Sequence, residues 1–140
     1  MKQSLFDAIG GLSVMQRVHT SFYDKVYAHP WLGQFFAGHD QKIIELRQTQ
    51  FMAEKMGAKD IYPGKDLDVA HKRMYITEEL LLLRQTLLRE AIEEEGIAAD
   101  LVTRWLKIDR AFWSKIKNDS LEAFEKVDLK YERPLIVDKP

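Results

Sequence analysis

The chain has 140 residues, of which 46% are hydrophobic and 11% aromatic, a length that suits one domain with one core better than two. Lysine and arginine number 21 against 22 acidic residues, so the formal net charge is −1 and no strong field is available to gather nucleic acid. Because the chain has no cysteine, disulfides, thiolate metal sites and thiol catalysis are excluded.

The first residues carry charge and no apolar run of secretory length, and no later stretch approaches the length of a membrane span. We therefore expect a cytoplasmic protein with no membrane partner. Any metal chemistry in such a chain has to use histidine, carboxylate or tyrosine ligands.

The first long helix is predicted to begin near Val14 and to end before Pro30. Ser13 precedes Gln16 by three residues, the spacing of a capping box in which side chains and backbone donors satisfy one another. Apolar residues recur every four positions along this segment, and an adjoining stripe carries a histidine and a phenol. The first stripe is Val14, Val18, Phe22 and Val26, and the second is Met15, His19 and Tyr23.

A short turn over residues 31–36 leads to a second long helix, predicted over about 41–56. One face of this helix carries Ile44, Gln48, Phe51 and Met52, and Gln48 is the odd polar member of that stripe. Gly57 ends the helix. A loop over 60–65, with a Pro-Gly turn, then precedes a short helical piece that holds His71.

Two more helices complete the predicted fold. A stripe of Leu80, Leu83, Leu87 and Ala91, widened by Leu81, Leu82 and Leu88, indicates a helix buried on more than one side and closed by Gly96. The last helix is predicted over 100–117, with Leu101, Trp105, Ile108 and Phe112 facing inward. The chain is therefore predicted to be all-α, with one domain over 1–117 and an extension of unknown role over 118–140.

Few catalytic signatures are present. The chain has no phosphate-binding glycine loop, no His-Glu-x-x-His motif and no serine elbow, which argues against ordinary hydrolases and transferases. His71, in contrast, follows the Pro-Gly loop on a short helix that faces the stripe of Ile44, Gln48 and Met52. Two such elements can bracket a flat ligand, which is the geometry of a haem pocket.

A set of separated landmarks carries a family resemblance: Leu5–Gly11, Phe22–Tyr23, Phe35–Phe36, Gln48 with Phe51–Met52, Tyr62–Gly64 and His71. In order and spacing this set resembles the truncated haemoglobins, over residues 4–117, and the intervals are most similar to those of the first subgroup. The resemblance implies a globin-like, truncated two-over-two helical sandwich around haem b. The chain departs from the pattern at Ala58, where paired glycines are usual, and at Arg84, near which other subgroups carry a tryptophan.

The resemblance also implies roles for individual residues. His71 matches the ligand of the haem iron, with its second ring nitrogen oriented by a neighbouring acceptor, and Phe36 matches the aromatic that lies against the porphyrin. Tyr23 and Gln48 match the polar pair on the opposite side of the haem, where donors stabilise the partial negative charge on bound dioxygen. Ile44 falls where many globins have a distal histidine, so an imidazole from that position cannot bind the iron.

The remaining expected contacts are to the edges and the wall of the pocket. Arg47, Lys72 and Arg73 are candidates to pair with the haem propionates, because cationic side chains bind carboxylates. Phe51 and Met52 are expected in the apolar wall, a role that differs little from plain core packing.

The sequence leaves three kinds of function open. The first is reversible binding of dioxygen, for transport or storage, together with nitric oxide and carbon monoxide as ligands. The second is an enzyme, either a nitric oxide dioxygenase that forms nitrate or a peroxidase, and both need a reductant, such as an unidentified reductase. The third is a gas sensor or a helical interaction module without haem.

Overall fold

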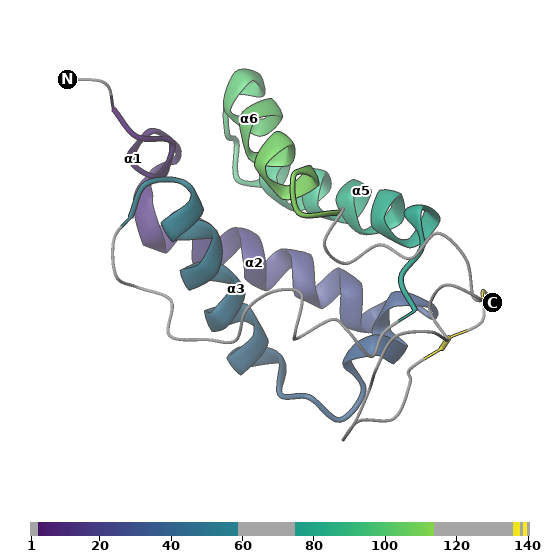
Figure 1. Ribbon diagram of the computed structural model, residues 1–140. Coiled ribbons are helices and arrows are strands. Elements are labelled where there is room, and N and C mark those ends of the chain that lie inside the picture. Colours follow the sequence, from purple (N-terminus) through teal and green to yellow (C-terminus); the bar gives the residue numbers. More distant parts are fainter. Residues whose placement is uncertain (1–2, 59–74, 114–135, 138, 140) are drawn as a thin grey trace.

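A computed structural model describes residues 3–58, 75–113, 136, 137 and 139 (Figure 1). Every regular element in these ranges is helical, which confirms the predicted fold class. The elements are α1 (Leu5–Ile9), α2 (Gly11–Ala28), the 3₁₀ helix η1 (Leu32–Phe36), α3 (Gln41–Lys55), α5 (Glu78–Glu94) and α6 (Ala99–Arg110). None of the described helices is long and apolar enough to cross a membrane.

The longer helices form two pairs, α2 with α3 and α5 with α6. α2 packs against α3 on one side and against α5 on the other, and α6 packs against α5 (Figure 1). α2 thus contacts both its own partner and the second pair, so side chains on different faces of this single helix contribute to one core. This arrangement agrees with the expected two-over-two sandwich.

The prediction of a capping box at Ser13 is wrong. α2 begins at Gly11, and no side chain caps it. Gly10 has a φ of 113°, and a Cβ there would lie 2.6 Å from Val14 Cγ2, so glycine lets the chain turn directly from α1 into α2. The side-chain cap lies earlier, where the Ser4 hydroxyl accepts a hydrogen bond from Asp7 N at 3.1 Å and starts α1.

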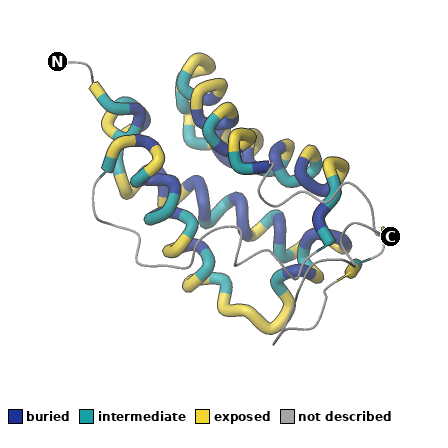
Figure 2. The backbone as a smooth tube through the Cα atoms, viewed as in Figure 1, coloured by how far each residue is buried: buried dark blue, intermediate teal, exposed yellow. Residues whose placement is uncertain are grey.

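The buried faces differ in detail from the predicted stripes (Figure 2). On α3 the buried residues are Glu45, Thr49, Met52 and Ala53, whereas Ile44, Gln48 and Phe51 are half-buried. On α5 the buried residues are Leu80, Leu81, Gln85, Leu88, Ala91 and Ile92, and Leu82 is 47% exposed. The prediction that Leu82 widens the buried face was therefore wrong, because helical rotation carries that position to the outer side.

α6 ends earlier than predicted. It stops at Arg110, where Phe112 N donates to Asp109 O at 3.3 Å in a tight turn that follows the α-helical hydrogen bonds. Its buried face carries Val102, Trp105, Leu106 and Asp109. The predicted Trp105 is fully buried, while Leu101, Ile108 and Phe112 are half-buried beside it. Residues 114–117 of the predicted helix lie outside the described residues.

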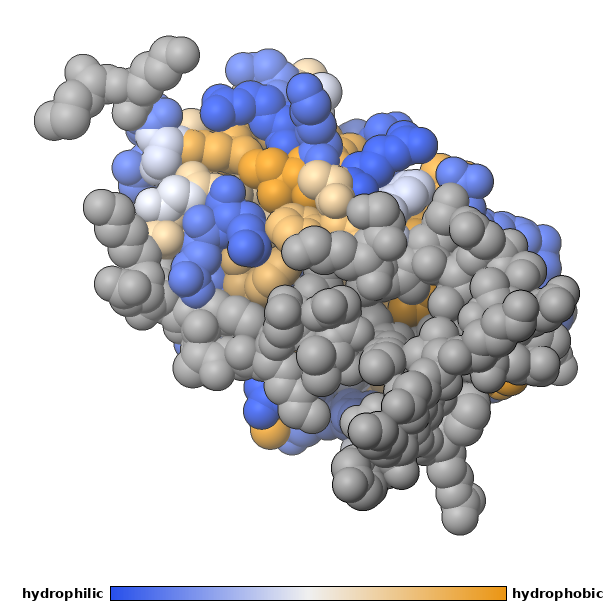
Figure 3. Space-filling model, in the orientation of Figure 1, coloured by the Kyte–Doolittle hydropathy of each residue, from blue (hydrophilic) through white to orange (hydrophobic). Residues whose placement is uncertain are grey.

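The extension predicted over 118–140 is described only at its end, at Ile136, Val137 and Lys139. Trp31 Nε1 donates to Val137 O at 3.1 Å, and Lys139 forms an ion pair with Glu79. This part of the extension therefore packs back on the helical domain. On the face drawn in Figure 3, apolar side chains gather in the middle of the described region, between polar flanks.

Candidate functional site

An aromatic cluster surrounds Tyr23 in the second half of α2. The Tyr23 ring lies 4.8 Å from the ring of Phe22, 5.7 Å from Phe36 and 6.4 Å from Tyr27, between centroids. All three contacts are edge-to-face, the geometry that aromatic quadrupoles favour. The cluster brings Phe36 of η1 beside Tyr23 of α2, two residues that the resemblance assigned to one ligand site.

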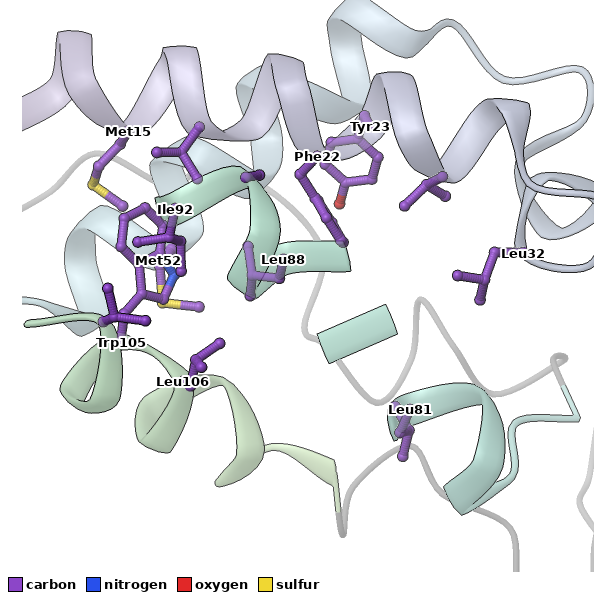
Figure 4. Close-up of a cluster of buried hydrophobic side chains, with 14 of the residues drawn as sticks. Met15, Phe22, Tyr23, Leu32, Met52, Leu81, Leu88, Ile92, Trp105 and Leu106 are labelled. Carbon is purple, nitrogen blue, oxygen red and sulfur yellow. The ribbon is translucent and has the colours of Figure 1, made fainter. Parts of the chain in front are cut away.

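The Tyr23 side chain is buried, with 5% of its surface exposed. Burial raises the pKa of the phenol well above its ordinary value, in spite of the opposing positive charge of Arg84. Tyr23 therefore stays protonated at physiological pH and keeps a hydroxyl proton to donate. Among the described residues, none has a recorded hydrogen bond to this hydroxyl. Figure 4 shows the hydroxyl pointing away from the axis of α2.

Hydrogen bonds connect α2 to α3 next to this cluster. His19 Nδ1 lies 2.7 Å from Thr49 Oγ1, and the Thr20 hydroxyl donates to Glu45 Oε1 at 2.7 Å. Gln41 Nε2 donates to Asp24 Oδ1 at 2.7 Å and to Glu45 Oε2 at 2.9 Å. We call these three links, His19–Thr49, Thr20–Glu45 and Asp24–Gln41, the polar ladder.

The polar ladder explains why the buried face of α3 is rotated from the predicted stripe. Glu45 and Thr49 lie inward because each finds a hydrogen-bonding partner on α2, which offsets the cost of burying a polar group. Ile44, Gln48 and Phe51 consequently lie on the neighbouring face as half-buried residues. These are three of the four residues on the α3 stripe that the sequence assigned to the ligand pocket.

The fourth residue of that stripe, Met52, has a different position. It is 1% exposed and lies well apart from Tyr23 in the cluster drawn in Figure 4. Its surroundings are those of a core residue. Arg47, a candidate partner for a propionate, is exposed on α3.

A partly buried ion pair between α5 and α6 contacts the aromatic cluster at Phe22. Arg84 Nη1 of α5 lies 2.7 Å and 2.8 Å from the two carboxylate oxygens of Asp109 on α6, and the Arg84 guanidinium carbon lies 5.2 Å from the centre of the Phe22 ring. The Asp109 side chain is 5% exposed and that of Arg84 is 23% exposed. This pair joins α5 to α6 and places a cation against the ring beside Tyr23.

His19 is the second buried polar group near Tyr23, with a distance of 6.5 Å between the two ring centroids. Burial, together with the charge of Arg84, lowers the pKa of His19 to about 3. The imidazole is therefore neutral at physiological pH. Its Nε2 has no recorded hydrogen-bond partner among the described residues. The imidazole packs edge-to-face with the ring of Trp105, with 5.8 Å between the two centroids.

Several of these residues were missed as part of the site by sequence reasoning, above all Thr49, Glu45 and Asp109. A usable signal was present for some of them. Arg84 interrupts a run of leucines, and Asp109 lies on the same helical face as Trp105, so each places a charge within an apolar stripe. Thr49 gave no comparable signal, because a threonine within a helix is ordinary on either face.

The loop over 60–65 and the residues His71, Lys72 and Arg73 lie outside the described residues. The described residues of the expected haem site are those on the side opposite His71. There the structure has an aromatic surface at Phe36, half-buried apolar residues at Ile44 and Phe51, and a protonated hydroxyl at Tyr23. Apolar side chains with a few placed donors suit a flat, largely apolar ligand such as haem, so the chemistry of the described residues fits the group.

Comparisons with known proteins identify the fold. The crystal structure of truncated hemoglobin from Tetrahymena pyriformis in its Fe(III) form superposes with a TM-score of 0.78, at 23% identity, covering 84% of this chain and 100% of that one. At this identity the likeness establishes the fold alone. With the two helix pairs described above, it defines a globin of the two-over-two type.

The family follows from the sequence comparisons. The bacterial-like globin family model matches residues 4–118. The group 1 truncated hemoglobin GlbN of Mycolicibacterium paratuberculosis is 28% identical over 103 residues, which are 74% of this chain and 76% of that protein. The chain belongs to the truncated haemoglobins and is thus a haem globin.

A second relative, the group 1 truncated hemoglobin LI410 of Chlamydomonas moewusii, is 36% identical over 69 residues. These residues are 49% of this chain and 40% of the relative, so this match spans less than half the length of either protein. Both relatives carry the group 1 name, in agreement with the subgroup that the landmark spacing favoured.

Proposed function

We propose that this globin binds dioxygen reversibly at a haem that His71 ligates, with Tyr23 and Gln48 as hydrogen-bond donors to the gas. The observation that carries the proposal is the state of Tyr23, whose side chain is 5% exposed and whose phenol is protonated, with no recorded hydrogen-bond partner for its hydroxyl among the described residues. A buried donor normally finds an acceptor. A small polar ligand is the acceptor that the proposed site would supply.

Haem, when bound, supplies an iron that takes up dioxygen, nitric oxide or carbon monoxide. The chain's own residues then perform three tasks. Phe36, Ile44 and Phe51 offer apolar surface to the porphyrin and exclude water. Arg47, Lys72 and Arg73 offer cations to the propionates. His71 provides the imidazole ligand to the metal.

The donor role of Tyr23 follows from the charge on the ligand. Dioxygen in such a site carries partial negative charge on its outer atom, and a hydroxyl proton beside it is attractive. A net gain of about 1–1.5 kcal/mol for one hydrogen bond slows release roughly tenfold when the rate of association is unchanged. Carbon monoxide is less polar and gains less, so the same donors favour dioxygen over carbon monoxide.

Absorption spectra of the purified protein test the proposal. The wild type and His71→Ala are expressed with ample haem and measured in the ferric, reduced and carbon monoxide-treated states. His39→Ala is the matched control, because His39 is an exposed histidine. We expect a strong Soret band that sharpens with carbon monoxide in the wild type and the control, and that is lost or altered in His71→Ala. A wild type that takes up no haem, or a His71→Ala spectrum identical to it, contradicts the proposal.

A further inference from the structure

The polar ladder lies next to both proposed donors. His19 is one helical turn before Tyr23 on α2, a distance of about 6 Å along the axis. Its partner Thr49 directly follows Gln48 on α3. The other two links involve Asp24 and Glu45, which directly follow Tyr23 and Ile44 in sequence. Each link thus fixes the backbone of a residue beside the expected ligand site.

The His19–Thr49 link is the most deeply buried part of the ladder. Both residues are 1% exposed, so water does not compete for this hydrogen bond, and breaking it leaves polar atoms unpaired in the core. Because the pKa of His19 is about 3, the imidazole does not gain a proton at physiological pH. Protonation of His19 therefore does not break this link at physiological pH.

The spacing of α2 and α3 matters because the proposed donors come from different helices. A hydrogen bond from Tyr23 or Gln48 to a small ligand weakens steeply once the distance exceeds about 3.2 Å. Apolar packing alone tolerates shifts of a few tenths of an ångström between helices, whereas a 2.7 Å hydrogen bond between short side chains defines both distance and register.

We propose that His19 and Thr49 are positioning residues, which hold α2 and α3 at the spacing that lets Tyr23 and Gln48 donate to the same ligand. This inference rests on the proposed function, since it concerns the donors named there. The His19–Thr49 link would then influence ligand affinity without itself reaching the ligand.

The test compares Thr49→Val, which removes the hydroxyl and keeps the shape, with Thr49→Ser, which retains the hydroxyl. Thr103→Val is the matched control, because the exposed Thr103 hydroxyl bonds only to Ala99 O of its own helix among the described residues. Two readouts are taken on haem-loaded protein: the C–O stretching frequency with carbon monoxide, which reports donors near the ligand, and the rate of dioxygen release. Tyr23→Phe is measured alongside.

We expect Thr49→Val to shift the C–O stretch toward higher frequency, in the direction of Tyr23→Phe, and to speed dioxygen release about threefold or more, as loss of part of a hydrogen bond predicts. Thr49→Ser should restore both values, and Thr103→Val should leave them unchanged. If Thr49→Val does not fold, Thr20→Val breaks the half-buried neighbouring link and should move the same two readouts in the same direction.

The outcomes separate this inference from the proposed function. If Tyr23→Phe shifts the stretch and the release rate while the Thr49 and Thr20 variants leave them unchanged, the positioning role is overturned and the donor role stands. If Thr49→Ser behaves like Thr49→Val, packing rather than the hydroxyl is responsible, and the inference also fails. If Tyr23→Phe itself has no effect, the donor role fails, and the positioning role fails with it.

Discussion

Replacing Tyr23 by phenylalanine removes a single oxygen atom from the proposed ligand site. The ring contacts with Phe22, Phe36 and Tyr27, at 4.8, 5.7 and 6.4 Å, do not depend on that atom. Among the described residues, no recorded hydrogen bond is lost when the hydroxyl is removed. We therefore expect the free energy of unfolding of Tyr23→Phe to differ from the wild type by less than about 1 kcal/mol.

The effect on the ligand should be larger than the effect on the fold. Loss of one hydrogen bond of about 1–1.5 kcal/mol predicts dioxygen release roughly tenfold faster. Carbon monoxide release should change less, because that ligand is less polar. Stopped-flow displacement of dioxygen by carbon monoxide measures the first rate, and displacement of carbon monoxide by nitric oxide measures the second.

Tyr27→Phe provides the control, one helical turn further along α2. The Tyr27 hydroxyl donates to His39 O at 3.1 Å near the surface, so its loss should affect stability slightly and dioxygen release not at all. The reasoning is refuted if Tyr23→Phe releases dioxygen at the wild-type rate. It is refuted equally if Tyr27→Phe accelerates release as much as Tyr23→Phe, since the effect would then not be specific to the buried hydroxyl.

Three further predictions concern the other residues in and around the site. Gln48→Leu should also speed dioxygen release, and slower release in stopped-flow would contradict its donor role. Asp109→Asn should lower the free energy of unfolding in urea by about 3 kcal/mol, because it leaves Arg84 as a poorly compensated charge, while Asp100→Asn at an exposed site of α6 should change it little. His19 has its pKa lowered from 6.5 to about 3, so the unfolded chain binds the extra proton between these values, and stability falls as the pH is lowered through this window. Urea titrations at about pH 6 and pH 4 should show the free energy of unfolding falling by about 1.4 kcal/mol per pH unit because of this group, and His19→Gln should lack this loss. Equal pH slopes in both proteins would exclude a contribution from His19.

Periodicity predicted the helices well because an amphipathic helix repeats its apolar residues every three or four positions whatever it packs against. The segments around α2, α3, α5 and α6 were predicted as helices for this reason. Asp40 accepts hydrogen bonds from Lys42 N and Ile43 N and caps α3, which begins at residue 41 as predicted. The start of α2 was predicted wrongly because the capping-box pattern at Ser13 indicated a later start than the one the chain adopts. The chain turns at the glycine pair Gly10–Gly11, which lets α2 follow α1 directly.

The sequence by itself determined the fold class through its periodicity and indicated the family through residue types and spacings along one chain. The candidate pair Tyr23 and Gln48 followed from that resemblance. Only the tertiary structure decided which polar residues face inward. Glu45 and Thr49 are buried because α2 presents Thr20 and His19 to them, and Asp109 is buried because Arg84 of α5 lies opposite. The burial of a polar side chain depends on a partner that is distant in sequence, since burial without that partner would cost more free energy than the fold gains.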